Sequence, residues 1–129
     1  MRKFFLYWFP VIVWAGLIFA VSSIPNLKSE LPGGWDLFLR KCAHAVEYMI
    51  FAFLILRAFS SSGRVSWIDI FFVIVLVALY AASDEIHQTV VIGRHGSLWD
   101  TGFDTLAGIV GAIFSRRILL KCADRKRKV

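Results

Sequence analysis

Four long apolar segments, separated by short polar stretches, make up most of this 129-residue chain. The segments cover about residues 4–23, 43–59, 67–88 and 99–120, and a basic tail follows at 121–129. About 20 apolar residues are enough for a helix to cross the hydrocarbon core of a bilayer. The pattern therefore predicts an all-α polytopic membrane protein, a bundle of four transmembrane helices that forms one domain over residues 1–129.

The first apolar segment is uncharged from residue 4 to residue 21. Ala20-Val21-Ser22 resembles a signal-peptide cleavage site, but the segment is longer than the usual apolar core of 7–15 residues. We therefore expect it to be retained as a helix. Pro25, Pro32 and two glycines follow it, which predicts a loop over residues 24–39.

The overall composition agrees with a membrane protein. Apolar residues make up 58% of the chain, which is too large a share for a soluble protein of this size. The net charge of +6 comes from basic residues at the ends of the apolar segments and in the tail. This distribution is typical of membrane orientation and of contact with anionic lipid, so we expect the bilayer and no nucleic acid as a partner.

The lysines and arginines also predict an orientation. Four alternating spans place eleven of them on one side and four on the other, and the richer side is expected to be cytoplasmic. Both termini are then in the cytoplasm of a plasma membrane, and Cys42 and Cys122 lie on opposite faces, where they cannot pair. The richer side has Arg2, Lys3, Arg57, Arg64, Arg116, Arg117, Lys121, Arg125, Lys126, Arg127 and Lys128, and the other has Lys28, Arg40, Lys41 and Arg94.

Candidate chemistry gathers on the less basic side. Asp84 and Glu85 end a long apolar segment, where a charged side chain without a partner costs about 2.5–3.5 kcal/mol at mid-bilayer. Four spans bring the start of the second segment, the end of the third and the start of the fourth to the same depth. We therefore expect one polar pocket there. The candidate catalytic residues are His44, Asp84, Glu85 and Asp104, and the candidate ligand-binding residues are Lys41, Glu47, Tyr48, His87, Gln88, Arg94 and Asp100.

The helical period separates the two neighbouring acids. Asp84 and Glu85 point about 100° apart on a helix, so one of them faces something other than the pocket. Which of the two does so stays open.

These residues leave three chemical interpretations. In the first, Asp84 or Glu85 acts with Asp104 and His44 in a hydrolase or transferase, while Lys41 or Arg94 holds an anionic headgroup. In the second, histidines and carboxylates bind a divalent metal, although the i, i+3 spacing of His44 and Glu47 has no second copy. In the third, the polar groups pair with one another, fix the helix packing and do no chemistry.

A proton or ion relay is a further alternative, but it requires polar residues through the whole depth of the membrane. The far halves of the segments are apolar apart from residues near their edges, such as Arg57 and Asp69. The sequence identifies no cofactor, and it leaves the oligomeric state open.

Four motifs carry a family resemblance: Lys41-x-x-His44-x-x-Glu47-Tyr48, Ser83-Asp84-Glu85-Ile86-His87-Gln88, Gly93-Arg94-x-Gly96-Ser97-x-x-Asp100 and Asp104-Thr105-x-Ala107-Gly108. In order and spacing they resemble the VanZ-like family of small membrane proteins. Two positions depart from the family pattern, since Arg40 stands where aspartate is frequent and Asp104 where asparagine is frequent.

The resemblance implies a small membrane protein of the cell envelope. The family takes its name from a protein associated with low-level resistance to the glycopeptide teicoplanin. An outward-facing polar pocket fits a ligand at the outer leaflet, such as a lipid-linked wall precursor, a phospholipid headgroup or a lipoglycopeptide. This expectation is an analogy, because a fold by itself does not establish a function.

Overall fold

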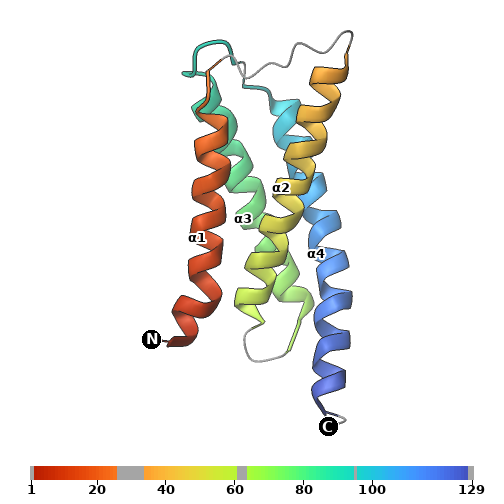
Figure 1. The fold of residues 1–129 in the computed structure, drawn as a ribbon. Helices are drawn as coiled ribbons and strands as arrows, with labels where there is room; N and C mark the ends of the chain where they lie inside the picture. The colour runs from red at the N-terminus through yellow and green to blue at the C-terminus, as the bar shows by residue number, and fades with distance from the viewer. Residues whose placement is uncertain (1, 26–33, 61–63, 95, 128–129) are drawn as a thin grey trace.

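The computed structural model describes residues 2–25, 34–60, 64–94 and 96–127. In these residues four helices follow one another: α1 (Arg2–Ser22), α2 (Trp35–Phe59), α3 (Trp67–Gln88) and α4 (Leu98–Arg127). They run up and down beside one another as a bundle, and no strand occurs among the described residues (Figure 1). The predicted all-α bundle is confirmed.

Two helices are longer than predicted. α2 begins at Trp35 and not at residue 43, because the last helix-breaking residue before it is Gly34 and the charged residues that follow are compatible with a helix. Asp36 and Arg40, four residues apart in the first turns, form an ion pair of 2.8 Å. α4 continues to Arg127 and not only to residue 120, since no glycine or proline interrupts its charged end.

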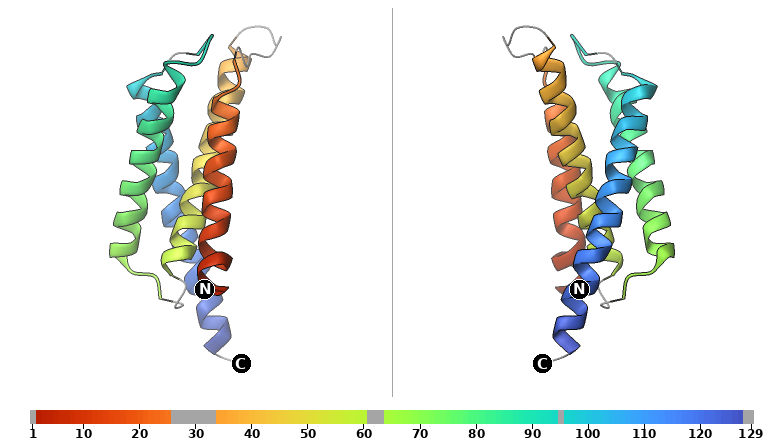
Figure 2. Two further views of the ribbon diagram at one scale, coloured as in Figure 1. Left: turned by 90° about the vertical axis from the view of Figure 1, so that its left-hand side faces the viewer. Right: turned by 90° about the vertical axis from the view of Figure 1, so that its right-hand side faces the viewer.

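Three of the helices are long and apolar enough to cross a membrane: Phe4–Ser22, Trp35–Phe59 and Trp67–Gln88. α4 is not among them, because the charged residues Asp104 and Arg116 leave an uncharged stretch of only residues 105–115 between them. It nevertheless lies along the other helices through most of its length (Figure 2). That α4 also crosses the membrane stays a prediction.

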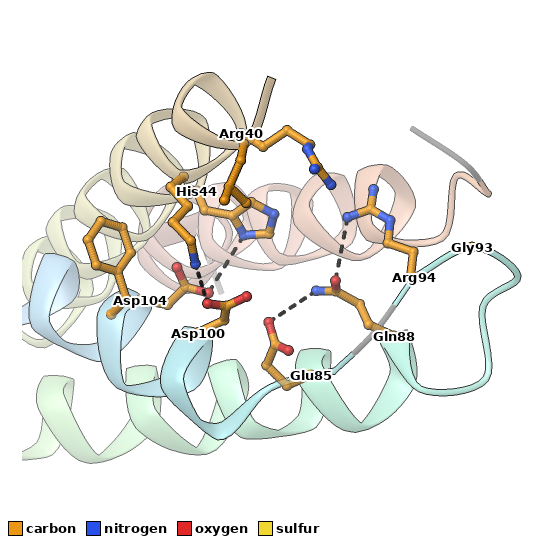
Figure 3. Close-up of a pocket in the computed structure, with 11 residues that line it drawn as sticks. Arg40, His44, Glu85, Gln88, Gly93, Arg94, Asp100 and Asp104 are labelled. Carbon is orange, nitrogen blue, oxygen red and sulfur yellow. Dashed lines mark hydrogen bonds and ion pairs between the residues drawn. The ribbon is translucent and has the colours of Figure 1, made fainter. Parts of the chain in front are cut away.

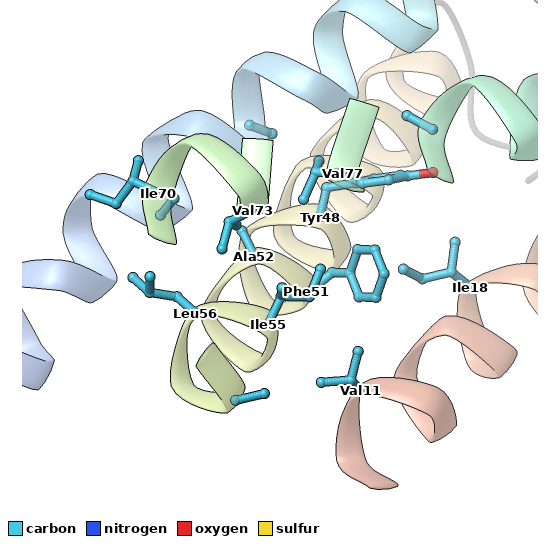
Figure 4. Packing of buried hydrophobic residues seen from close by; sticks show 14 residues of the cluster. Val11, Ile18, Tyr48, Phe51, Ala52, Ile55, Leu56, Ile70, Val73 and Val77 are labelled. Carbon is cyan, nitrogen blue, oxygen red and sulfur yellow. The ribbon is translucent and has the colours of Figure 1, made fainter. Parts of the chain in front are cut away.

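α2 lies at the centre of the packing and contacts each of the other three helices. Its buried face consists of Tyr48, Phe51, Ala52, Ile55 and Leu56, which pack against side chains of α1 and α3 (Figure 4). Large apolar side chains also cover the outside of the bundle, as expected for a surface that faces lipid tails. Examples are Phe5, Phe71, Leu79 and Leu106.

Small residues set the position of α4. A Cβ atom at Gly111 would lie 2.7 Å from Met49 Cα, and one at Gly108 would lie 2.5 Å from Val77 Cγ1. The two glycines therefore let α4 approach α2 on one side and α3 on the other.

Both chain termini lie at one end of the bundle (Figures 1 and 2). At the opposite end α1 and α3 finish and α2 and α4 begin, so the three predicted polar clusters meet at one depth. We call this the cavity end of the bundle. The topology that joins the clusters is as predicted, whereas their assignment to the outer face of a plasma membrane stays a prediction.

Candidate functional site

A cavity of about 250 Å³ lies at the cavity end, between α2, α3, α4 and the turn that follows α3 (Figure 3). Seven of the predicted site residues line it. These are Lys41, His44, Glu85, Gln88, Arg94, Asp100 and Asp104, and the remaining lining residues are Leu37, Arg40, Gly93 and Phe103.

An ion pair and a histidine–carboxylate contact connect α2 to α4 along one wall of the cavity. Lys41 Nζ forms an ion pair with Asp100 Oδ1 and lies 5.7 Å from the centre of the Phe103 ring. One helical turn deeper, His44 Nδ1 lies 3.6 Å from Asp104 Oδ2. Asp104 is only 2% exposed, and this carboxylate oxygen accepts no hydrogen bond from the described residues. The pairs hold the starts of α2 and α4 together, and all four residues line the cavity.

Glu85 forms part of the opposite wall and meets the start of α4. Its Oε2 accepts a hydrogen bond of 2.7 Å from the backbone N–H of Ser97, the residue that precedes the helix. Negative charge is stabilised at such a position, because the first N–H groups of a helix have no partner within the helix. The close approach depends on Gly96, where a Cβ would clash with the carbonyl oxygen of Glu85. This contact joins the end of α3 to the start of α4.

Asp84 faces away from the cavity and contacts α1. Its Oδ2 accepts hydrogen bonds from Ser22 Oγ at 2.8 Å and from Gln88 Nε2 at 2.9 Å, and the residue is only 2% exposed. Asp84 is therefore the acid of the pair that faces something other than the cavity, and Glu85 is the one that lines it.

His87, a predicted ligand-binding residue, lies on the same α1 side. Its Nε2 and Ser23 Oγ form a hydrogen bond of 2.9 Å, and its ring stacks on Phe19 with 4.3 Å between ring centres. It does not line the cavity. Together with Asp84 it fastens the end of α1 to α3.

Arg94 serves both regions. Its Nη2 and Nε donate to the carbonyl oxygens of Val21 (2.9 Å) and Ile24 (3.3 Å), at the end of α1. Its Nη1 donates to Gln88 Oε1 at 3.4 Å. A cation is stabilised beside the free carbonyls of a helix C-terminus, so Arg94 caps α1 while its charge borders the cavity.

Glu47 and Tyr48 also lie outside the cavity lining. Tyr48 is completely buried, its ring packs near those of Phe51 and Tyr80, and its hydroxyl has no hydrogen-bond partner among the described residues. The backbone carbonyl of Glu47 accepts a hydrogen bond of 2.9 Å from Trp14 Nε1. In this structure Tyr48 is a residue of the helix core.

The sequence interpretation did not include Arg40 among the candidate site residues, because it placed the start of the second helix at residue 43. Its Nη2 pairs with Asp36, and its buried Nε has no hydrogen-bond partner among the described residues. A signal for it was present, because Leu37, Lys41 and His44 share its i, i+3, i+4, i+7 stripe. The stripe becomes visible only once the helix is known to begin at Trp35.

No group of three or more histidine, cysteine or carboxylate side chains is placed to hold a metal ion, among the residues whose positions are described. The metal interpretation of His44 and Glu47 therefore has no geometric support from this part of the chain. Cys42 and Cys122 are both exposed and unpaired.

The family model described as VanZ/LLP1 matches residues 5–120. No curated protein and no solved structure matches the chain. Since the match covers nearly all of the sequence, this chain belongs to the VanZ/LLP1 family, and its apolar helices identify it as a membrane protein.

Proposed function

We propose that this VanZ/LLP1 family protein binds the phosphate-bearing headgroup of a membrane lipid, or of a lipid-linked envelope component, in the cavity between α2, α3 and α4. The observation that carries this proposal is the presence of three cationic side chains, Arg40, Lys41 and Arg94, around one cavity at the end of a membrane bundle. Guanidinium and ammonium groups are the side chains that bind phosphate oxygens most strongly.

The size of the cavity supports a compact ligand. Pockets for drug-sized molecules occupy about 300–1,000 Å³, whereas this cavity has about 250 Å³. A phospholipid headgroup or a phosphate linkage fits such a volume. The sugar or peptide part of a wall precursor would extend beyond it.

The location that goes with this proposal is a plasma membrane with both termini in the cytoplasm, which places the cavity at the outer leaflet. In the cell, such binding would change the lipid profile or the susceptibility to teicoplanin. Deletion and overexpression test this: if neither changes lipid composition or teicoplanin susceptibility, the cellular part of the proposal is wrong.

The binding test compares a phospholipid with the diacylglycerol of the same acyl chains, which lacks the phosphate. Native mass spectrometry of the purified protein in a maltoside detergent measures both. We expect wild type to retain the phospholipid and to lose it in the double variant Arg40→Gln/Lys41→Gln. The matched control is Arg117→Gln/Lys121→Gln, which removes the same charge from exposed positions near the other end of α4. Equal binding by the two double variants would contradict the proposal.

A membrane-embedded hydrolase or transferase is the second candidate. The observation that favours it is that His44 and Asp104 form a pair, and that both residues line the same cavity as the cations. In such a site the histidine acts as general base toward water or a substrate hydroxyl, and the aspartate orients its ring. Phosphate release from a lipid-phosphate substrate by wild type, with loss in His44→Gln, would establish this candidate. Turnover that is equal in wild type and His44→Gln would exclude it.

The relay alternative has less support. Outside the cavity end, the buried polar side chains among the described residues are Ser60 and Ser115. Ser115 Oγ already donates to the carbonyl oxygen of Gly111 in its own helix. Two serines do not form a continuous path for ions or protons.

A further inference from the structure

Apart from Lys41, which pairs with Asp100, the charged side chains around the cavity are separated by sign. The guanidinium groups of Arg40 and Arg94 lie toward the turn that follows α3, and the carboxylates of Glu85, Asp100 and Asp104 lie on the other side (Figure 3). The helix positions agree, because His44, which pairs with Asp104, is four residues beyond Arg40 on α2. Four residues correspond to about 6 Å along a helix axis.

Two of the three carboxylates have no lysine or arginine partner among the described residues. Asp100 is paired with Lys41, but from the described part of the chain Glu85 receives hydrogen bonds only from the Ser97 N–H and from Gln88. Within the described ranges, the one basic side chain beside Asp104 is His44, at 3.6 Å, and Asp104 Oδ2 is buried without a hydrogen bond. A buried carboxylate is costly unless a cation or a set of donors accompanies it.

Since the described residues supply no lysine or arginine for Glu85 and Asp104, a bound ligand is the candidate source of a cation here. A metal ion is a poor candidate, since no group of three or more acidic, histidine or cysteine side chains among the described residues is placed to hold one. An ammonium group does not need such a set of ligands. Each of its N–H groups can donate a hydrogen bond to a single carboxylate oxygen. Asp104 and Glu85 each offer a carboxylate to such an ammonium group.

From this geometry we propose that the headgroup bound in the cavity is zwitterionic and carries a primary amine. Its phosphate lies against the guanidinium side with Arg40 and Arg94, and its ammonium lies between Glu85 and Asp104. The phosphoethanolamine group has this chemistry, with one anion and one primary amine joined by a two-carbon chain. This inference rests on the proposed function and adds the chemical class of the headgroup.

Buried Arg40 Nε gives the phosphate side an unused donor, as Asp104 Oδ2 gives the amine side an unused acceptor. A purely anionic headgroup would accept a hydrogen bond from Arg40 Nε and leave Asp104 Oδ2 unpaired. A quaternary ammonium would bring its charge but no N–H donor, so it would leave the Asp104 oxygen without a hydrogen bond. The cavity is therefore expected to distinguish a primary amine from both alternatives.

The test uses the full-length protein in a maltoside detergent and three lipids with identical acyl chains: phosphatidylethanolamine, phosphatidylcholine and phosphatidylglycerol. Native mass spectrometry measures their competition at equal concentration. We expect wild type to prefer phosphatidylethanolamine by about tenfold, the size of one charge-assisted hydrogen bond. Asp104→Asn should abolish this preference and still bind phosphatidylglycerol. Asp124→Asn, an exposed aspartate in the last turns of α4, is the matched control and should keep the preference.

The outcomes separate this inference from the function on which it rests. Equal binding of phosphatidylglycerol and phosphatidylethanolamine by wild type would overturn the amine site and leave phosphate binding intact. No binding of any of the three lipids would overturn both. A preference for phosphatidylethanolamine that survives in Asp104→Asn would contradict the placement of the ammonium beside Asp104. If this variant does not fold, Glu85→Gln and the comparison of the three lipids on wild type test the same placement.

Free phosphoethanolamine separates the lipid from a soluble source of the same chemistry. We expect it to displace phosphatidylethanolamine only in large excess, because it lacks the acyl chains that hold a lipid beside the bundle. Tighter binding of the free molecule than of the lipid would overturn the assignment to a lipid.

Discussion

Gly111→Ala tests whether the contact between α2 and α4 determines the cavity. A Cβ at this position would lie 2.7 Å from Met49 Cα and 2.8 Å from Met49 O. Both are backbone atoms, so no side-chain rotation relieves the overlap and α4 has to move away from α2. Overpacking of this kind costs about 1–3 kcal/mol, while alanine in place of glycine returns about 0.8–1.0 kcal/mol of helix propensity. We expect a net destabilisation of about 0–2 kcal/mol, with displacement of the helix pair.

Gly102→Ala is the matched control on the same helix. Nothing lies within 4 Å of a Cβ there, so only the helix propensity changes and the variant should be more stable than wild type. Thermal unfolding followed by circular dichroism in maltoside gives both stabilities, and lipid retention reports on the cavity. The two variants should differ by about 1–3 kcal/mol, the overpacking cost alone. If Gly111→Ala matched Gly102→Ala in stability and in lipid binding, the reasoning from close helix contact would be refuted.

Three further predictions concern other contacts. Ser22→Ala should destabilise the protein by about 1–3 kcal/mol, because it removes a buried hydrogen bond to the Asp84 carboxylate; thermal unfolding measures this. Arg116→Gln should cost about 0.5–2 kcal/mol in the same assay, since the guanidinium lies 4.3 Å from the centre of the Trp67 ring. Cys122 should react with a membrane-impermeant maleimide only after the cells are permeabilised, because the predicted orientation places it in the cytoplasm.

Each of these predictions has a control. Ser83→Ala removes an exposed hydroxyl that bonds only within its own helix, so it should leave stability unchanged. Arg117→Gln removes the neighbouring exposed arginine and should also have little effect. A Cys42→Ser background assigns the maleimide signal to Cys122. Labelling of Cys122 in intact cells would contradict the predicted orientation and indicate the opposite one.

The sequence was sufficient for the helices and for the meeting of the polar clusters. Alternating apolar segments fix the direction of each helix, so the placement of Lys41, Glu85 and Asp100 at one end follows from topology alone. The contacts of α4 were also readable, since Gly108 and Gly111 mark the sides on which another helix comes close.

The sequence did not show which polar residues of the clusters line the cavity and which ones pack against α1. Helical spacing shows that Asp84 and Glu85 diverge, but the direction of each depends on where α1 packs, and α1 carries no charge from Phe4 to Ser22 that marks its position. Only the hydroxyl of Ser22 on Asp84 and the N–H of Ser97 on Glu85 decide it. Arg40 was missed for a different reason: the second helix was predicted to begin at residue 43, so the helical face that Arg40 shares with Lys41 and His44 was not considered.

Gln88 connects the two regions that the structure separates. Its Nε2 donates to Asp84 Oδ2 and lies 3.4 Å from Glu85 Oε1, and its Oε1 accepts from Arg94. A change at Asp84 therefore reaches the cavity through this amide without any contact between Asp84 and a ligand. Loss of binding in an Asp84 variant would not identify that residue as part of the site, whereas Asp104 lines the cavity itself. For this reason the decisive comparison is made at Asp104, with the stability of each variant measured alongside its binding.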